Sequence, residues 1–167
     1  GLDEDKADAA LPRDVVAAMG LAGDGPHDLH AVVAAFGPDV LLGTTGIGGA
    51  FTEAVVRAMG DACERPIIMP MSNPTAATEA RPSDILEWTG GRAIVATGSP
   101  FAPVEYGGRA YRIPQANNAY VFPGIGLGAV ACRARTLPDE LFLAAARTLA
   151  RLVGKVELDQ ACLYPPL

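Results

Sequence analysis

Three asparagines stand where a side-chain amide could bind a small polar ligand. Asn73 follows the apolar run "PIIMPMS" and precedes a proline, which cannot continue a strand. Asn117 and Asn118 are adjacent, in the segment "PQANNAYVFPG" between two prolines. The NH₂ of an amide can donate to a carboxylate while its carbonyl accepts from a hydroxyl or another amide. These residues could therefore orient a molecule that carries carboxylate and hydroxyl groups.

Each of these amides also has a purely structural interpretation. Asn-Pro followed by Thr75 suits an Asx turn or a helix N-cap. The adjacent pair precedes an apolar helical stretch, so an exposed turn would account for it. Ser99, in "ATGSPF", could likewise cap a turn or contact a cofactor. The residues alone leave both interpretations open.

A glycine cluster, "GTTGIGG" at 43–49, lies between an apolar run and a helical pattern. Backbone amides at such a junction, together with the helix dipole, favour an anion. The spacing is not G-x-G-x-x-G, however, and the cluster lacks the Lys and Ser/Thr ending of a P-loop. Close packing of a helix on a sheet and contact with a cofactor both remain possible functions of these glycines.

Other reactive side chains form no recognisable catalytic set. His27 and His30 are three residues apart, with no carboxylate cluster beside them, and a surface position is expected for both. No Ser-His-Asp or Cys-His arrangement and no metal-binding pair of carboxylates stands out. We expect neither a catalytic residue nor a metal ligand within this sequence.

Composition restricts the partners and the compartment. The formal net charge is −6 over 167 residues, which argues against nucleic acid because phosphate binding needs basic patches. No apolar run approaches the roughly 20 residues of a membrane span, so no membrane partner is expected. The three cysteines show no CxxC spacing, which favours neither a disulfide framework nor a zinc site and indicates an intracellular protein. The cysteines are Cys63, Cys132 and Cys162.

The elements that must position these side chains alternate between strand and helix. Short apolar runs predict strands at 39–44, 66–71 and 92–98, and helices are predicted at 29–36, 51–59 and 82–88. This alternation indicates a parallel α/β sheet, in which ligands bind beyond the carboxyl ends of the strands. That rule points to the segments 43–49, 71–75 and 98–100.

The remaining segments are interpreted from their composition and periodicity. Residues 1–26 are rich in Asp, Ala, Gly and Pro and are expected to be mostly irregular. A hairpin is predicted at 104–113, with its turn at Gly107 and Gly108. The stretch 122–133 predicts a helix packed on most sides, and 137–153 predicts an amphipathic helix.

Four segments in this order resemble the malic enzymes, the decarboxylating malate dehydrogenases. The matching text is "LLGTTGIGGAFTEAVVRAM", "ERPIIMPMSNPTAATEA", "GRAIVATGSPFAPVEYGGRAYRIPQANNAYVFPGIGLGAV" and "LYPPL". The resemblance implies the C-terminal half of a Rossmann-like NAD(P)-binding domain, incomplete in this chain. It also implies NAD or NADP as cofactor, Mg²⁺ or Mn²⁺, and oxidative decarboxylation of L-malate to pyruvate and CO₂. The implied organisation is a lead-in at 1–27, the Rossmann-like half domain at 28–154 and a C-terminal extension at 155–167.

The resemblance also implies roles for individual residues. Asn73 matches an asparagine that touches malate and the nicotinamide ribose, and of Asn117 and Asn118 one binds a malate carboxylate. The loop 44–48 matches the strand end that passes the adenosine side of the cofactor. The implied cofactor-binding residues are Thr44, Thr45, Gly46, Ile47, Gly48, Ser72, Asn73 and Ser99.

Several family features belong upstream of this sequence: the G-x-G-x-x-[GA] fingerprint, the lysine base, the tyrosine acid, the malate-binding arginine and the metal carboxylates. The chain is therefore expected to be part of a longer malic enzyme and inactive by itself. In the intact enzyme a homo-oligomer, either a tetramer or a dimer, is implied. The alternative is a non-catalytic Rossmann-like nucleotide-binding or regulatory module. The choice between NAD and NADP, and among cytoplasm, mitochondrion and plastid, stays open.

Overall fold

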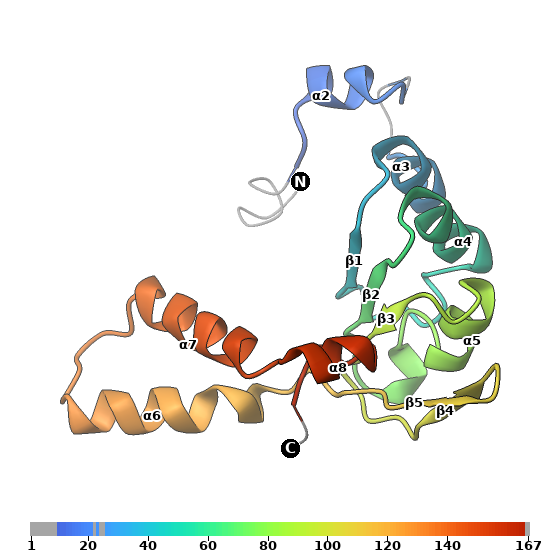
Figure 1. Ribbon diagram of the computed structural model, residues 1–167. Coiled ribbons are helices and arrows are strands. Elements are labelled where there is room, and N and C mark those ends of the chain that lie inside the picture. Colours follow the sequence, from blue (N-terminus) through green and yellow to red (C-terminus); the bar gives the residue numbers. More distant parts are fainter. Residues whose placement is uncertain (1–9, 22, 24–25, 166–167) are drawn as a thin grey trace.

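A three-stranded parallel sheet forms the centre of the α/β body (Figure 1). The computed structural model describes residues 10–21, 23 and 26–165. Val40 pairs with Ile67, which in turn pairs with Ile94, so the three strands run side by side in the order β1-β2-β3. Their carboxyl ends therefore meet at one edge of the sheet, as predicted. The strands are β1 (Val40–Gly43), β2 (Ile67–Pro70) and β3 (Ile94–Val95).

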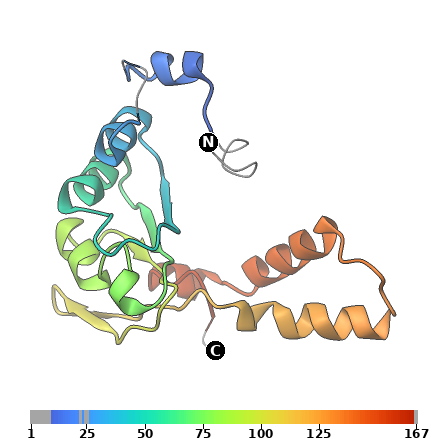
Figure 2. The same ribbon diagram turned by 180° about the vertical axis from the view of Figure 1, so that it is seen from behind.

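Three helices lie together on one side of this sheet (Figures 1 and 2). The hydroxyl of Thr52 caps the second of them by accepting from the amide of Val55 at 3.4 Å. A proline in the first turn suits the start of the third. The core between helices and sheet is apolar, and Met59, Ile68 and Ile85 are completely buried. The helices are α3 (Leu29–Phe36), α4 (Glu53–Ala62) and α5 (Pro82–Trp88).

The opposite face of the sheet is not covered in the same way. Val40 and Leu42 of β1 are 50% and 56% exposed, although both are large and apolar. An incomplete Rossmann-like domain is expected to have helices on one face of its sheet and exposed apolar strand residues on the other. The fold class expected from the sequence is thus confirmed, as a parallel sheet flanked by helices that forms part of such a domain.

An antiparallel hairpin follows the sheet and packs against α5. It consists of β4 (Val104–Tyr106) and β5 (Arg109–Tyr111). Gly107 and Gly108 form the turn with φ of 58° and 75°, which glycine adopts at little cost. The predicted hairpin and its turn are confirmed. Two short 3₁₀ helices, η1 (Thr75–Ala77) and η2 (Asn118–Tyr120), lie near the carboxyl edge of the sheet.

The lead-in was expected to be mostly irregular, but it contains a short helix, α2 (Arg13–Ala18). None of its residues is buried, and it lies apart from the α/β body in both views (Figures 1 and 2). The prediction for 1–9, 22, 24 and 25 lies outside the described residues.

Two helices extend away from the body as a pair, α6 (Phe122–Ala131) and α7 (Asp139–Arg151) (Figures 1 and 2). The expectation that the helix at 122–133 is packed on most sides is wrong for this chain. Ile125 is its one buried residue, whereas Leu127 and Val130 are 73% and 78% exposed. The main neighbours of α6 among the described elements are α7 and η2, and they leave Leu127 and Val130 uncovered.

A final helix, α8 (Lys155–Asp159), brings the chain back to the body. Cys162 is completely buried, and the rings of Tyr120 and Tyr164 stack with centroids 5.4 Å apart. The guanidinium of Arg112 donates to the carbonyl of Tyr164 at 2.7 Å. The segment after α8 is therefore attached to the body by burial and hydrogen bonds. Among the helices that the structure describes, none is both long and apolar enough to cross a membrane.

Candidate functional site

A hollow of about 450 Å³ lies at the carboxyl edge of the parallel sheet. Residues that follow all three strands line it, and they include all three asparagines of the sequence. The structure therefore brings these amides together at one edge of the sheet, which includes the predicted segments 71–75 and 98–100. The lining residues are Thr44, Met71, Asn73, Gly98, Gln115, Ala116, Asn117 and Asn118.

The segment that carries Asn117 and Asn118 reaches this edge by pairing with the chain after β3. The amide of Thr97 donates to the carbonyl of Pro114 at 3.1 Å, and the amide of Ala116 donates to the carbonyl of Thr97 at 2.8 Å. This parallel bridge places residues 115–118 beside the edge as a short fourth strand would be placed. Two segments that are distant in sequence thereby contribute to the same hollow.

The side chain of Asn73 is exposed at the hollow, but its orientation is fixed from behind. The hydroxyl of Ser99, which is only 2% exposed, donates to Asn73 Oδ1 at 2.7 Å. The opposite side of the amide, Nδ2, lies 3.5 Å from the carbonyl of Met71. Since the carbonyl oxygen is already engaged, the NH₂ group is the part of Asn73 with donor capacity for a ligand.

Asn117 has the structural function that its sequence context allowed. Its Oδ1 accepts from the amide of Ala119 at 2.9 Å and caps η2. This bond uses the carbonyl and leaves the NH₂ donors of Asn117. Asn118 is the first residue of η2, and its side chain is exposed at the same hollow.

In the glycine loop after β1, several backbone amides donate hydrogen bonds to side-chain oxygens of the protein itself. The amide of Thr45 donates to Glu79 Oε1 at 2.8 Å, that of Gly46 to Ser72 Oγ at 2.8 Å, and that of Ile47 to Thr45 Oγ1 at 3.0 Å. Amides that already have acceptors cannot also hold a phosphate without rearrangement. The loop therefore does not form a phosphate cradle.

Close packing accounts for the glycines of this loop instead. A Cβ on Gly48 would lie 2.5 Å from the carbonyl oxygen of Ala76, so this position requires glycine. Gly46 has φ of 69°, a left-handed conformation that glycine adopts readily. Of the five loop residues expected at the cofactor, only Thr44 lines the hollow. Thr45, Gly46, Ile47 and Gly48 are exposed but do not line it. Ser72 and Ser99 are buried, and Ser99 contacts Asn73 through its hydroxyl.

Sequence reasoning did not identify two residues that the structure brings to the site. Gln115 lines the hollow, and its Nε2 donates to the carbonyl of Gly98 at 2.9 Å. Glu79 is completely buried next to the loops that follow β1 and β2, which form the rim of the hollow, and it accepts hydrogen bonds from Thr45 and Ser72. A signal for Gln115 was present, because it lies two residues before the asparagine pair. The segment containing Glu79 gives no comparable signal.

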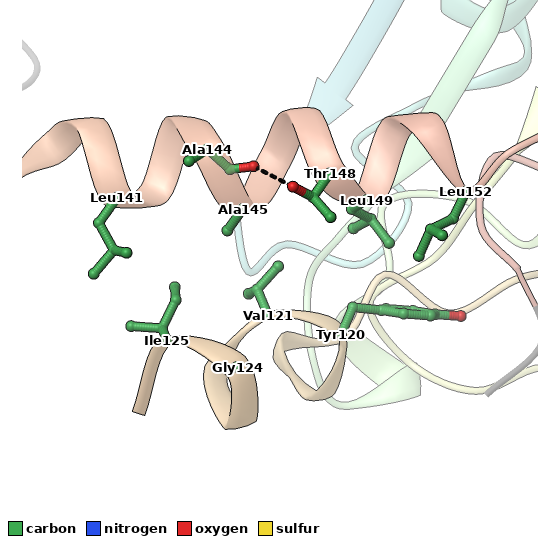
Figure 3. A pocket seen from close by; sticks show the side chains of 10 residues that line it. All are labelled: Tyr120, Val121, Gly124, Ile125, Leu141, Ala144, Ala145, Thr148, Leu149 and Leu152. Atoms are coloured by element: carbon green, nitrogen blue, oxygen red, sulfur yellow. Dashed lines mark hydrogen bonds between the residues drawn. The ribbon is translucent and has the colours of Figure 1, made fainter. Parts of the chain in front are cut away.

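A second hollow of about 300 Å³ lies between α6 and α7 (Figure 3). Leu141 and Leu149 project from α7 toward α6, where Ile125 lies opposite Leu141, and the lining is mostly apolar. The hydroxyl of Thr148 is occupied, since it donates to the carbonyl of Ala144 at 2.8 Å. This hollow lacks convergent polar groups and does not resemble a site for a charged substrate.

The described residues contain no group of three or more His, Cys, Asp or Glu side chains that could hold a metal ion. The residues at the carboxyl edge offer amides, hydroxyls and backbone groups instead. Such groups recognise carboxylates, hydroxyls and ribose by hydrogen bonds, but they do not provide the carboxylate ligands that Mg²⁺ or Mn²⁺ requires.

The family model described as "Malic enzyme, NAD binding domain" matches residues 12–167. The chain belongs to the malic enzyme family. The match begins upstream of the 28–154 unit expected from the sequence and includes α2. The matched region also contains the whole carboxyl-edge hollow.

Several malic enzymes are similar to the chain along most of its length. The NAD-dependent malic enzyme of Acinetobacter baylyi is 50% identical over 130 residues, which are 78% of this chain and 23% of that protein. The enzyme of the same name from Photorhabdus laumondii is 53% identical over 128 residues, 77% of this chain and 23% of that protein. That of Shewanella denitrificans is 56% identical over 113 residues, 68% of this chain and 20% of that protein. The chain thus spans only about a quarter of these malic enzymes.

Proposed function

We propose that this chain is the C-terminal part of the NAD(P)-binding domain of a malic enzyme, which converts L-malate to pyruvate and CO₂ while reducing NAD(P). The observation that supports this most is the hollow at the carboxyl edge, where all three asparagines meet. Ligands of parallel α/β sheets bind at this edge. The names of the relatives favour NAD over NADP.

Asn73, fixed by Ser99, directs its NH₂ group toward malate and the nicotinamide ribose. One residue of the pair Asn117 and Asn118 donates to a malate carboxylate. Thr44 and the loop behind it lie on the adenosine side of the cofactor. Ser72 and Ser99 support these contacts from behind the rim, where both are buried.

When bound, NAD(P) supplies the acceptor for the hydride that leaves C2 of malate. The residues of this chain contribute binding and orientation, because they hold the reacting groups in position and take no part in proton transfer. In this proposal the proton-transfer groups and the ligands for Mg²⁺ or Mn²⁺ belong to other parts of the malic enzyme; among the described residues, no group of three or more His, Cys, Asp or Glu side chains could hold a metal ion. The 167-residue chain is therefore inactive by itself.

The intact enzyme is an intracellular homo-oligomer, either a dimer or a tetramer. The large exposed apolar side chains on α6 and α7 support burial of this pair of helices by further protein. The three cysteines are free thiols, which supports a reducing compartment.

A nuclear magnetic resonance titration of the 167-residue chain tests the proposed contacts. Adding NAD⁺ and then L-malate at millimolar concentrations is expected to shift the side-chain amide signals of Asn73, Asn117 and Asn118, because ligand groups replace water at these donors. Gln160 is the internal control, since it carries the same amide at the end of α8 and does not line the hollow. Equal shifts at Gln160, or none at the asparagines, would contradict the assignment.

Turnover provides a separate measurement. The 167-residue chain with NAD⁺, L-malate and Mn²⁺ is expected to produce no NADH above the background without protein, because groups for proton transfer and metal binding are missing. A full-length malic enzyme that contains this sequence, assayed in parallel, is the positive control. NADH formation by the chain at a rate typical of enzymes, above about 1 s⁻¹, would refute the proposed division of functions.

A further inference from the structure

Glu79 is a completely buried carboxylate directly behind the candidate site. Its Oε1 accepts from the amide of Thr45 at 2.8 Å, from the hydroxyl of Thr45 at 3.0 Å and from the hydroxyl of Ser72 at 2.5 Å. Its Oε2 accepts from the amide of Ser72 at 3.3 Å. Four donors from two loops thus converge on one side chain.

These hydrogen bonds join the two loops that form the rim. Thr45 adjoins Thr44 in the loop after β1, and Ser72 adjoins Asn73 in the loop after β2; both Thr44 and Asn73 line the hollow. Ser72 Oγ also accepts from the amide of Gly46 at 2.8 Å, which adds a direct connection between the loops. Glu79 therefore connects the two loops through hydrogen bonds to both.

The surrounding structure leaves space for this carboxylate. A Cβ on Gly43 would lie 2.7 Å from Cδ of Glu79 and 2.7 Å from the ring of Phe51, so glycine at the end of β1 allows the approach. The carbonyl of Glu79 accepts from the amide of Phe51 at 2.9 Å, which fixes its backbone as well. Hydrogen bonds therefore hold Glu79 both at its carboxylate and at its backbone carbonyl.

The carboxylate is ionised at neutral pH. Burial raises the pKa of Glu79, but the hydrogen bonds from the Ser72 hydroxyl, the Thr45 amide and the backbone outweigh this and lower the pKa below its ordinary value. Among the described residues, the donors Thr45 and Ser72 and the close neighbours Gly43 and Phe51 are uncharged, whereas the charged Arg81 and Asp84 line a hollow that Glu79 also lines. A buried charge is costly to maintain, and such groups concentrate at functional sites.

We propose that Glu79 is a positioning residue of this site, whose carboxylate sets the relative placement of Thr44 and Asn73 and hence of the cofactor and malate between them. This inference rests on the proposed function and deepens it. Glu79 touches neither ligand, so its effect reaches them through Thr45 and Ser72. Glu79→Gln has the same shape but lacks the charge and one acceptor, which makes it the direct test.

The first measurement needs no ligand. In the 167-residue chain, Glu79→Gln is expected to shift the backbone amide signals of Thr45, Gly46 and Ser72 and the side-chain amide signal of Asn73. The matched control is Thr89→Val, which removes a buried hydroxyl that donates to the carbonyl of Ile85 at 2.7 Å, just before β3 and away from the carboxyl edge. Unchanged signals at Thr45 and Gly46 in Glu79→Gln would overturn the proposal.

The wild-type chain gives the same test by titration, even if Glu79→Gln fails to fold. Because the folded pKa is lowered, the contribution of the carboxylate is complete above its unfolded pKa of about 4.3 and is lost as the pH falls through the folded pKa. The amide signals of Thr45 and Gly46 are expected to stay constant from about pH 7 to 5 and to move together below about pH 4. If both signals move only with global unfolding, Glu79 does not position this loop.

Ligand affinity completes the experiment. Glu79→Gln is expected to weaken NAD⁺ binding about tenfold, since a displacement on the order of 1 Å in a positioning group can cost up to about a hundredfold. Thr89→Val should leave the affinity unchanged. If both variants weaken NAD⁺ binding equally, Glu79 has only a general structural role and does not position the site. The affinity is measured in a full-length malic enzyme that contains this segment: if that enzyme binds no NAD⁺, the proposed function fails, whereas the amide signals still decide whether Glu79 sets the placement of the two loops.

Discussion

Asn73→Ala is expected to lower kcat/KM for malate about a hundredfold in a full-length malic enzyme that contains this segment. The variant removes the NH₂ donor that we place against malate and the nicotinamide ribose, and it leaves the hydroxyl of Ser99 without its acceptor at 2.7 Å. A misplacement of the substrate on the order of 1 Å is enough for a loss of this size. Steady-state kinetics with NAD⁺ and L-malate measure it.

Asn73→Asp separates the two functions of this amide. The aspartate keeps an oxygen that can accept from Ser99, but it replaces the NH₂ donor with a negative charge that repels a dicarboxylate. We expect kcat/KM to fall further than in Asn73→Ala, with the additional loss mainly in KM for malate. Activity of Asn73→Asp within threefold of the wild type would show that only the bond to Ser99 matters and would refute the contact with malate.

Gly98→Ala is expected to destabilise the chain more than alanine at any other glycine that the structure describes. A Cβ at this position would lie 2.0 Å from the carbonyl oxygen of Met71 and 2.6 Å from its carbon. Both are backbone atoms, so no side chain can move aside. We expect a loss of about 3 kcal/mol or more in the free energy of unfolding. Thermal denaturation should show a Tm lower by roughly 10 °C.

Gly124→Ala in α6 is the matched control for this substitution. A Cβ at Gly124 meets nothing within 4 Å, and alanine is the better helix former by about 0.5–1 kcal/mol. Its Tm should therefore stay level or rise slightly. A Gly98→Ala variant as stable as Gly124→Ala would show that the close approach of residues 71 and 98 is not fixed. The contact between Asn73 and Ser99 would then not be fixed either.

The carboxyl-edge site could be anticipated because strand ends are local features. The apolar runs before Thr44 and Asn73 ended where the structure ends β1 and β2, within a residue or two. Parallel strands then bring these ends together, whatever the details of packing. The third strand was predicted at 92–98, but β3 pairs with β2 only over Ile94–Val95. Beyond it, Thr97 pairs with Gln115 instead, a partner that no local pattern could indicate.

Burial was harder to anticipate than secondary structure. The helix at 122–133 was correctly predicted as a helix, but its apolar residues were expected to be covered. Leu127 and Val130 are exposed because the main neighbours of α6, which are α7 and η2, do not cover them, and periodicity says nothing about how many neighbours a helix finds. The roles of the asparagines toward malate and NAD(P) stay predictions.

The sequence by itself determined the parallel α/β architecture, the edge at which its polar residues collect and the family to which it belongs. Those properties follow from apolar periodicity, from strand ends and from motifs that are each contained within a short segment. Only the tertiary structure decided that the glycine loop hydrogen-bonds inward and that Glu79 connects the two sides of the rim. Thr45 and Glu79 are 34 residues apart, and a buried carboxylate is stable only where the folded chain brings enough donors to it.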